Sequence, residues 1–97
     1  MKLVLTIVRD DDAGEVVDAL TEQGYYVTRL ASTGGFLRLG NTVLISGIED
    51  DELEPMLRVI ESHSEIHAAP PVSDSGPGAQ PSRAVVFVLD LQRIVKL

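Results

Sequence analysis

The sequence predicts an α+β fold in which strands and helices follow the order β-α-β-β-α-β. Two aliphatic runs of strand length stand near the two ends of the chain, at 3–8 and 84–89. Between them lie two amphipathic segments of about three helical turns. Each of these segments opens on a cluster of acidic residues. The stretch that separates them is rich in β-forming residues and is divided by a Ser-Thr-Gly-Gly turn.

In the first half, residues 3–8 are typical of a strand at the centre of a covered sheet. The aspartates at 10–12 predict the start of a helix, because acidic residues there complement the helix dipole. Asp12 and Glu15 have the spacing of a capping box, and Gly24 predicts the end of the helix. The apolar face expected for this helix consists of Ala13, Val16, Val17 and Leu20.

In the second half, residues 25–31 predict a second strand and residues 36–48 a third. Gly40 and Asn41 indicate a bulge or bend inside that third strand. Residues 49–52 open the second helix, and Pro55 falls in its first turn or just after, where a missing N–H costs little. The apolar face expected for this helix consists of Leu53, Met56, Leu57 and Ile60.

Residues 65–83 are rich in proline, glycine and serine, which predicts a long flexible loop without regular structure. Such a loop is either mobile or ordered by a ligand or partner. Residues 84–89 predict the final strand, and residues 90–97 a short tail.

These elements predict a single domain over 1–97 with a four-stranded antiparallel sheet and both helices on one face, the ferredoxin-like arrangement. The other face of the sheet is then bare. Because the strands are largely apolar, that face is expected to be covered by self-association, which also suits so small a chain.

Composition limits the classes of function. The 97 residues carry a net charge of −7, which disfavours a general nucleic-acid or anionic-membrane binder but not a small anionic ligand. The absence of cysteine excludes disulfides and thiolate chemistry. The N-terminal aliphatic run is too short for a secretory signal, and no apolar run approaches the roughly 20 residues of a membrane span. We therefore expect a cytoplasmic protein.

The segment 31–43 is unlike the rest of the chain. Two adjacent glycines, Gly34 and Gly35, allow close approach of the backbone to a ligand, and successive N–H groups in such a turn can bind an anion. Phe36, Arg38 and Asn41 add an aromatic face, a cation and an amide. The same pattern also suits an ordinary turn between strands, with Arg38 as the outward residue of an alternating strand.

No catalytic or metal site is predicted, and no cofactor is expected. Ser32, Ser46 and Ser62 have no evident partner arrangement of histidine and carboxylate. His63 and His67 straddle the end of the second helix, and the aspartates at 10–12 lack a second ligand cluster.

Residues 33–42, Thr-Gly-Gly-Phe-Leu-Arg-Leu-Gly-Asn-Thr, continued by Leu-Ile-Ser-Gly-Ile-Glu-Asp-Asp at 44–51, resemble the PII-like cyclic-di-AMP receptor family. The resemblance covers roughly the first 60 residues and returns at 86–89. It implies a PII-like core fold and a non-enzymatic homotrimeric signalling protein. Such a protein holds its nucleotide in clefts between subunits and captures or releases a target protein. The ligand-binding residues expected on this basis are Thr28, Thr33, Gly34, Gly35, Phe36, Leu37, Asn41, Gly47 and Phe87.

The chemistry of these residue types is consistent with a cyclic dinucleotide as the implied ligand. Phe36 and Phe87 offer faces to adenine, Asn41 can pair with a base edge, and the turn amides can meet phosphate.

The chain also departs from the family pattern. Where the family has Asn-x-Arg-x-Thr, this sequence reads Gly-Tyr-Tyr-Val-Thr at 24–28, so a base-edge amide and a phosphate-facing cation are missing. Lys96 stands where a glutamine is expected. Tyr26 can compensate by stacking, and Lys96 or Arg29 by positive charge. Another adenine nucleotide as ligand, and a metal-associated trimer like the CutA-type proteins, are the alternatives to cyclic-di-AMP binding.

Overall fold

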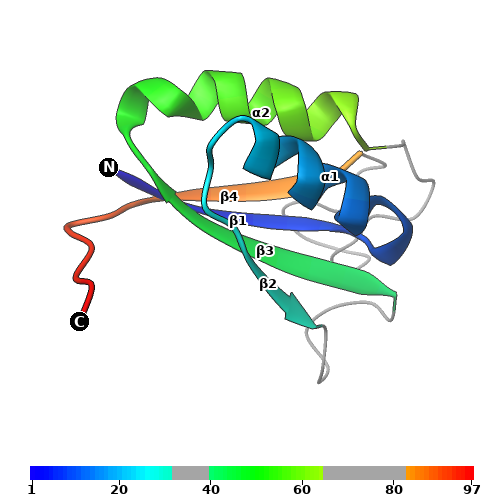
Figure 1. Cartoon of the computed structure of the whole chain (residues 1–97), viewed down its shortest axis with the longest axis horizontal. Helices are drawn as coiled ribbons and strands as arrows, with labels where there is room; N and C mark the ends of the chain where they lie inside the picture. The colour runs from blue at the N-terminus through cyan, green and yellow to red at the C-terminus, as the bar shows by residue number, and fades with distance from the viewer. Residues whose placement is uncertain (32–39, 65–82) are drawn as a thin grey trace.

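The computed structural model describes residues 1–31, 40–64 and 83–97 (Figure 1). The predicted order of elements is confirmed. In chain order they are β1 (Lys2–Arg9), α1 (Asp10–Glu22), β2 (Thr28–Ala31), β3 (Asn41–Ile48), the 3₁₀-helix η1 (Asp50–Glu52), α2 (Leu53–Ser62) and β4 (Val85–Asp90).

The four strands form one antiparallel sheet in the order β2-β3-β1-β4, and both helices lie over the same face (Figure 1). Strand β1 is central, so that Thr6 lies opposite Leu44 on β3 and opposite Val86 on β4. This is the predicted ferredoxin-like α+β fold. Within the described residues, no helix is both long and apolar enough to cross a membrane.

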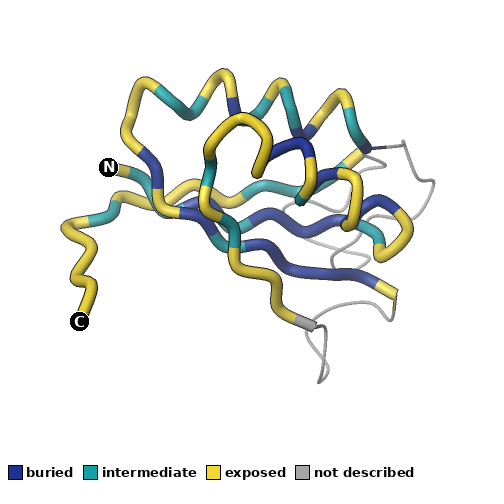
Figure 2. Tube along the Cα trace, viewed as in Figure 1, coloured by how far each residue is buried: buried dark blue, intermediate teal, exposed yellow. Residues whose placement is uncertain are grey.

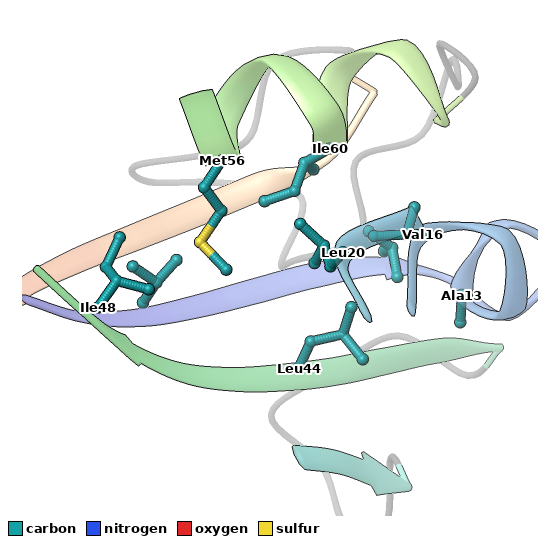
Figure 3. Close-up of a cluster of buried hydrophobic side chains, with 9 residues drawn as sticks. Ala13, Val16, Leu20, Leu44, Ile48, Met56 and Ile60 are labelled. Atoms are coloured by element: carbon teal, nitrogen blue, oxygen red, sulfur yellow. The ribbon is translucent and has the colours of Figure 1, made fainter. Parts of the chain in front are cut away.

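The core lies between the helices and the sheet, where alternate strand residues meet the predicted apolar helix faces (Figures 2 and 3). The buried members of this cluster are Val4, Val8, Ala13, Val16, Leu20, Leu44, Ile48, Met56 and Ile60. Val17, Leu53 and Leu57, which were expected on the same helix faces, are only partly buried. One face of the sheet is therefore filled by the two helices.

The capping box predicted from Asp12 and Glu15 is wrong. Helix α1 begins at Asp10, directly after β1, and its N-cap position is Arg9, which makes no side-chain capping bond. The three aspartates thus occupy the first turn, where they complement the dipole. Helix η1 does carry a capping box, in which the Glu49 backbone N–H donates to the Glu52 carboxylate over 2.9 Å.

The predicted end of α1 at Gly24 is confirmed. Gly24 has φ +90, and the next backbone N–H, from Tyr25, donates to the Leu20 carbonyl over 3.0 Å. Strand β2 is shorter than predicted, because residues 25–27 still belong to this helix-to-strand connection. Tyr25 packs against the core, and its hydroxyl donates to the Glu52 carbonyl over 3.5 Å.

The bend predicted inside the third strand lies instead directly before it. Gly40 has φ +88 in a turn, and its carbonyl accepts a hydrogen bond of 2.8 Å from the Asp10 backbone N–H. Strand β3 then starts at Asn41. Residues 32–39, and residues 65–82 of the loop predicted at 65–83, lie outside the described residues.

Candidate functional site

The sheet face opposite the helices is formed by the other set of alternating residues. On β1 and β3 this set includes Leu5 and Ile45, which lie opposite each other. Toward the start of β3, Ile7 and Val43 are buried in a small second cluster. The exposed apolar residues of this face are Leu30, Phe87 and Leu89, whose exposed fractions are 44%, 37% and 45%. The described part of this face therefore presents apolar surface to its surroundings.

A groove of about 670 Å³ lies on this face at the end of β3. From the sheet and the connection before it, the groove is lined by Leu3, Tyr26, Thr28, Ile45, Ser46 and Gly47. From the tail that follows β4, it is lined by Leu91, Arg93, Ile94 and Lys96. The groove thus brings β2, β3 and the chain's last residues into one place.

The tail is positioned by one backbone bond and one side-chain contact. The Leu91 backbone N–H donates to the Met1 carbonyl over 3.1 Å, which directs the chain after β4. A Cβ at Gly47 would lie 2.9 Å from Ile94 Cδ1 and 3.3 Å from Leu91 Cδ2. The missing side chain at Gly47 therefore makes the room in which these two tail residues lie.

The groove differs in charge from the molecule as a whole. The chain has a net charge of −7, yet the charged side chains that line the groove are Arg93 and Lys96, both positive. Among the residues that the structure describes, neither cation takes part in an ion pair. Tyr26, at the same groove, is 85% exposed. The groove therefore combines apolar sheet residues, an accessible phenol ring and two accessible cations.

Ion pairs hold the strand ends beside this groove. The N-terminal ammonium lies 3.0 Å from Asp50, and Lys2 pairs with Asp90. The hydrogen bond that Asp50 accepts from the N-terminal ammonium, followed by the attraction between the two charges, holds the pKa of Asp50 below its usual value. In the same way the hydrogen bond between Lys2 and Asp90 lowers the pKa of Asp90 and raises that of Lys2.

Four of the ligand-binding residues expected from the sequence lie in the described part of the chain. Thr28 and Gly47 line the groove together. Asn41 is buried at the opposite end of β3, roughly 20 Å away along the strand. Phe87 lies on β4 opposite Leu5 and does not line the groove. Thr33, Gly34, Gly35, Phe36 and Leu37 lie outside the described residues, as does Arg38.

Of the two cations considered as compensation, Lys96 lines the groove and Arg29 does not. Arg29 follows Thr28 on β2 and lies opposite Leu44, a core residue, so it belongs to the helix-covered side of the sheet. Arg93 and Ile94 also line the groove and were not expected from the sequence. The signal was present in the tail, where an apolar pair at 91 and 94 and a basic pair at 93 and 96 share one spacing.

A second, smaller hollow of about 260 Å³ lies at the other end of β3, lined by Arg9, Asp10, Asp11 and Gly40. There the Thr42 hydroxyl donates to the Asp10 carboxylate, which joins the start of β3 to the start of α1. His63 Nδ1 lies 3.1 Å from the Glu15 carboxylate and so links α2 to α1, while His67 lies outside the described residues. In the described part of the chain, no three metal-ligating side chains gather.

Comparison with known proteins assigns this architecture to the class of PII-like signalling proteins. A curated relative, the nitrogen fixation nifHD region GlnB-like protein 1 of Methanothermococcus thermolithotrophicus, is 32% identical over 75 residues. That match covers 64% of this chain and 71% of the relative. A crystal structure of a functionally unknown protein from Pediococcus pentosaceus superposes with a TM-score of 0.75 at 32% identity, covering 99% of this chain and 96% of that one.

The family is defined more closely by sequence. The profile of the cyclic-di-AMP receptor family matches residues 1–76, and the chain belongs to this family. The resemblance carried by the sequence at 33–42 is thereby confirmed.

Proposed function

We propose that this protein is a non-enzymatic sensor that binds an adenine nucleotide, cyclic-di-AMP in the first place, between the subunits of a homotrimer. The observation that carries the proposal is that Thr28 and Gly47, picked from separate parts of the family pattern, line one groove. The groove is large enough for part of a dinucleotide, and it lies on the face that the helices leave open. Its occupation would control the capture or release of a target protein.

The groove chemistry supports an anionic aromatic ligand. Exposed aromatic rings such as that of Tyr26 stack on bases, and the Thr28 hydroxyl can donate to phosphate or accept from a base edge. Cyclic-di-AMP carries two phosphodiester charges, which the two cations of the groove can balance.

A second subunit is part of the proposal, because one chain does not gather the whole expected site. Asn41 and Phe87 lie outside the groove that holds Thr28 and Gly47. In a trimer whose open sheet faces meet, a neighbour can bring its exposed Phe87, and the start of β3 where Asn41 is buried, next to the groove. The proposed site thus consists of Thr28, Thr33, Gly34, Gly35, Phe36, Leu37, Asn41, Gly47 and Phe87, distributed over two subunits.

The hydroxyls beside His63 support a non-enzymatic role. Ser62 donates to the Arg58 carbonyl over 2.7 Å, and Ser64 donates to the Ile60 carbonyl over 2.7 Å. Both hydroxyls therefore serve the end of α2, and neither is directed at the imidazole as a nucleophile would be.

The proposal is tested by calorimetric titration of the full chain with cyclic-di-AMP, cyclic-di-GMP, ATP and ADP, together with the mass in solution by light scattering. We expect one saturable site per subunit for cyclic-di-AMP and a trimer mass. Tighter binding of ATP or ADP would change the ligand but keep the sensor. The absence of heat and of any thermal shift with all four nucleotides would overturn the proposed function.

A further inference from the structure

We infer that the tail after β4 supplies the phosphate-binding charges of the groove through Arg93 and Lys96, and that the contact of Ile94 with Gly47 holds these cations in place. This inference rests on the proposed nucleotide binding and adds to it the residues that recognise the anion. It makes the tail a specificity-determining element in place of a cation on the second strand.

The second strand has no cation available for this role. On the groove side the connection and strand contribute Tyr26 and Thr28, which are uncharged. Arg29 belongs to the helix-covered side, opposite Leu44. An anionic ligand in this groove therefore has the tail as its source of positive charge within the described residues.

The placement of the tail depends on a residue without a side chain. Ile94 Cδ1 approaches to 2.9 Å the point at which a Cβ of Gly47 would lie, closer than real Cβ atoms are approached. Ile94 directly follows Arg93 and lies two residues before Lys96. Its contact with Gly47 on β3 therefore brings both cations to the groove. Any side chain at Gly47 would push this part of the tail outward.

The charges are also free to act. Neither Arg93 nor Lys96 is committed to an ion pair with a described residue, and both are exposed. In a chain of net charge −7, two cations without acidic neighbours in the groove lining form a local positive field. The apolar sheet residues beneath them, Leu3 and Ile45, suit the flat face of a base. We therefore expect the base to lie on the sheet and the phosphates to face the tail.

The charges are tested by the double variant Arg93→Gln/Lys96→Gln, titrated with cyclic-di-AMP at several salt concentrations. We expect a loss of affinity of about tenfold or more, since charged hydrogen bonds are lost, and a weaker dependence of Kd on salt. The matched control is Arg58→Gln, an exposed cation on α2 outside the groove, which should bind like the wild type. Arg29→Gln should also bind like the wild type.

The contact that positions the tail, between Ile94 and Gly47, is tested separately by Ile94→Ala, which leaves both charges in place. In the ligand-free protein we expect a shifted Gly47 amide resonance, and in the titration a weaker affinity. Leu97→Ala, at a fully exposed residue outside the groove, is the control for both measurements.

The outcomes separate this inference from the proposed function. A wild type that binds no nucleotide overturns the proposed function and this inference with it. A wild type that binds, together with an Arg93→Gln/Lys96→Gln variant of equal affinity and equal salt dependence, overturns the inference alone. If the double variant loses binding but the Gly47 resonance does not move in Ile94→Ala, the contact between Ile94 and Gly47 does not position the tail. The phosphate-binding role of Arg93 and Lys96 then stands.

Discussion

Gly47 shows how a single residue can matter through space and not through backbone conformation. Its φ does not lie in the left-handed region, where glycine is favoured, so an alanine meets no backbone strain there. What an alanine would meet is the side chain of Ile94, and that side chain is 50% exposed and able to move. The consequence of a substitution should therefore appear in the tail more than in the fold.

Gly47→Ala should lower nucleotide affinity while changing the free energy of unfolding by less than about 1 kcal/mol, because the neighbour that must give way is flexible. The double variant Gly47→Ala/Ile94→Ala removes the clash, so the two effects on affinity should not add. Urea unfolding and calorimetric titration of the four proteins of this cycle measure both quantities. Strictly additive effects on affinity would contradict the contact.

The ion pairs at the strand ends predict how stability depends on pH. Asp50 and Asp90 have a folded-state pKa below the ordinary value of 3.8, so the stability they contribute is present above that pH and is lost as the pH falls through the folded-state pKa. Lys2 has a pKa above its ordinary 10.5, so its contribution is present below that pH and is lost on further alkalinisation. Both pairs are exposed, and the effects are small.

Urea unfolding at pH 7 and at pH 3 should therefore show a loss of stability on acidification that is smaller in Asp90→Asn than in the wild type. Equal losses in the two proteins would show that the pair with Lys2 contributes nothing. Asp18→Asn, on the exposed side of α1, serves as the control for removing a carboxylate.

At the scale of elements, one glycine inside helix α1 and one just after its end should respond in opposite ways to substitution. Gly14→Ala should stabilise the protein by about 0.5–1 kcal/mol, because the site lies inside the helix and a Cβ there meets nothing within 4 Å. Gly24→Ala should destabilise it by about 1 kcal/mol or more, because the residue has φ +90 at the helix end. Equilibrium unfolding in urea measures both, and a change of the same sign at the two sites would contradict this assignment.

The elements were predictable where apolar periodicity and chain breakers agree. The run at 3–8, the helix stop at Gly24 and the helix with Pro55 in its first turn all appear at the expected places. The failures concern local chemistry. Asp12 and Glu15 have the right spacing for a capping box, but β1 passes into α1 without a loop, so the helix begins earlier than that box requires. The Gly40 carbonyl accepts a hydrogen bond from the Asp10 N–H, which is distant in sequence, and Gly40 therefore lies in a turn before β3.

At the scale of the whole molecule, the open sheet face is the feature that distinguishes the isolated chain from its proposed trimer. On β4, neighbouring residues report on the two faces separately. Leu89 lies opposite Leu3 on the open face, whereas Val88 lies opposite Val4 on the helix-covered face. Their exposed fractions, 45% and 41%, are nearly equal.

If the proposed trimer forms through the open face, Leu89→Glu should break it into smaller species, because three buried carboxylates would meet or approach one another in an already acidic protein. Val88→Glu, its neighbour on the other face, should keep the trimer mass. Light scattering after size-exclusion chromatography gives both masses, with circular dichroism to show that each variant is folded. A trimeric Leu89→Glu variant would place the subunit contact elsewhere.

The candidate site was predictable only in part. The sequence at 33–42 indicates the family, and Thr28 and Gly47 from the same resemblance lie at one groove. Arg93 and Ile94 could not be assigned from strand patterns, because the tail forms neither helix nor strand. Its position depends on the contact with Gly47 and on the hydrogen bond to the Met1 carbonyl. Asn41 and Phe87 lie apart from that groove within one chain, and a single sequence does not reveal which subunit completes a shared site.

The bond between the Leu91 N–H and the Met1 carbonyl has a practical consequence for handling this protein. The two ends of the chain lie on the same side of the molecule (Figure 1). Leu3 near the first end and Lys96 near the last both line the groove. A purification tag at the first residue would replace the ammonium that pairs with Asp50. A tag after Leu97 would lengthen the segment that walls the groove. Fluorescent labels for titrations are therefore better attached on the exposed side of α2, at Arg58 or Glu61.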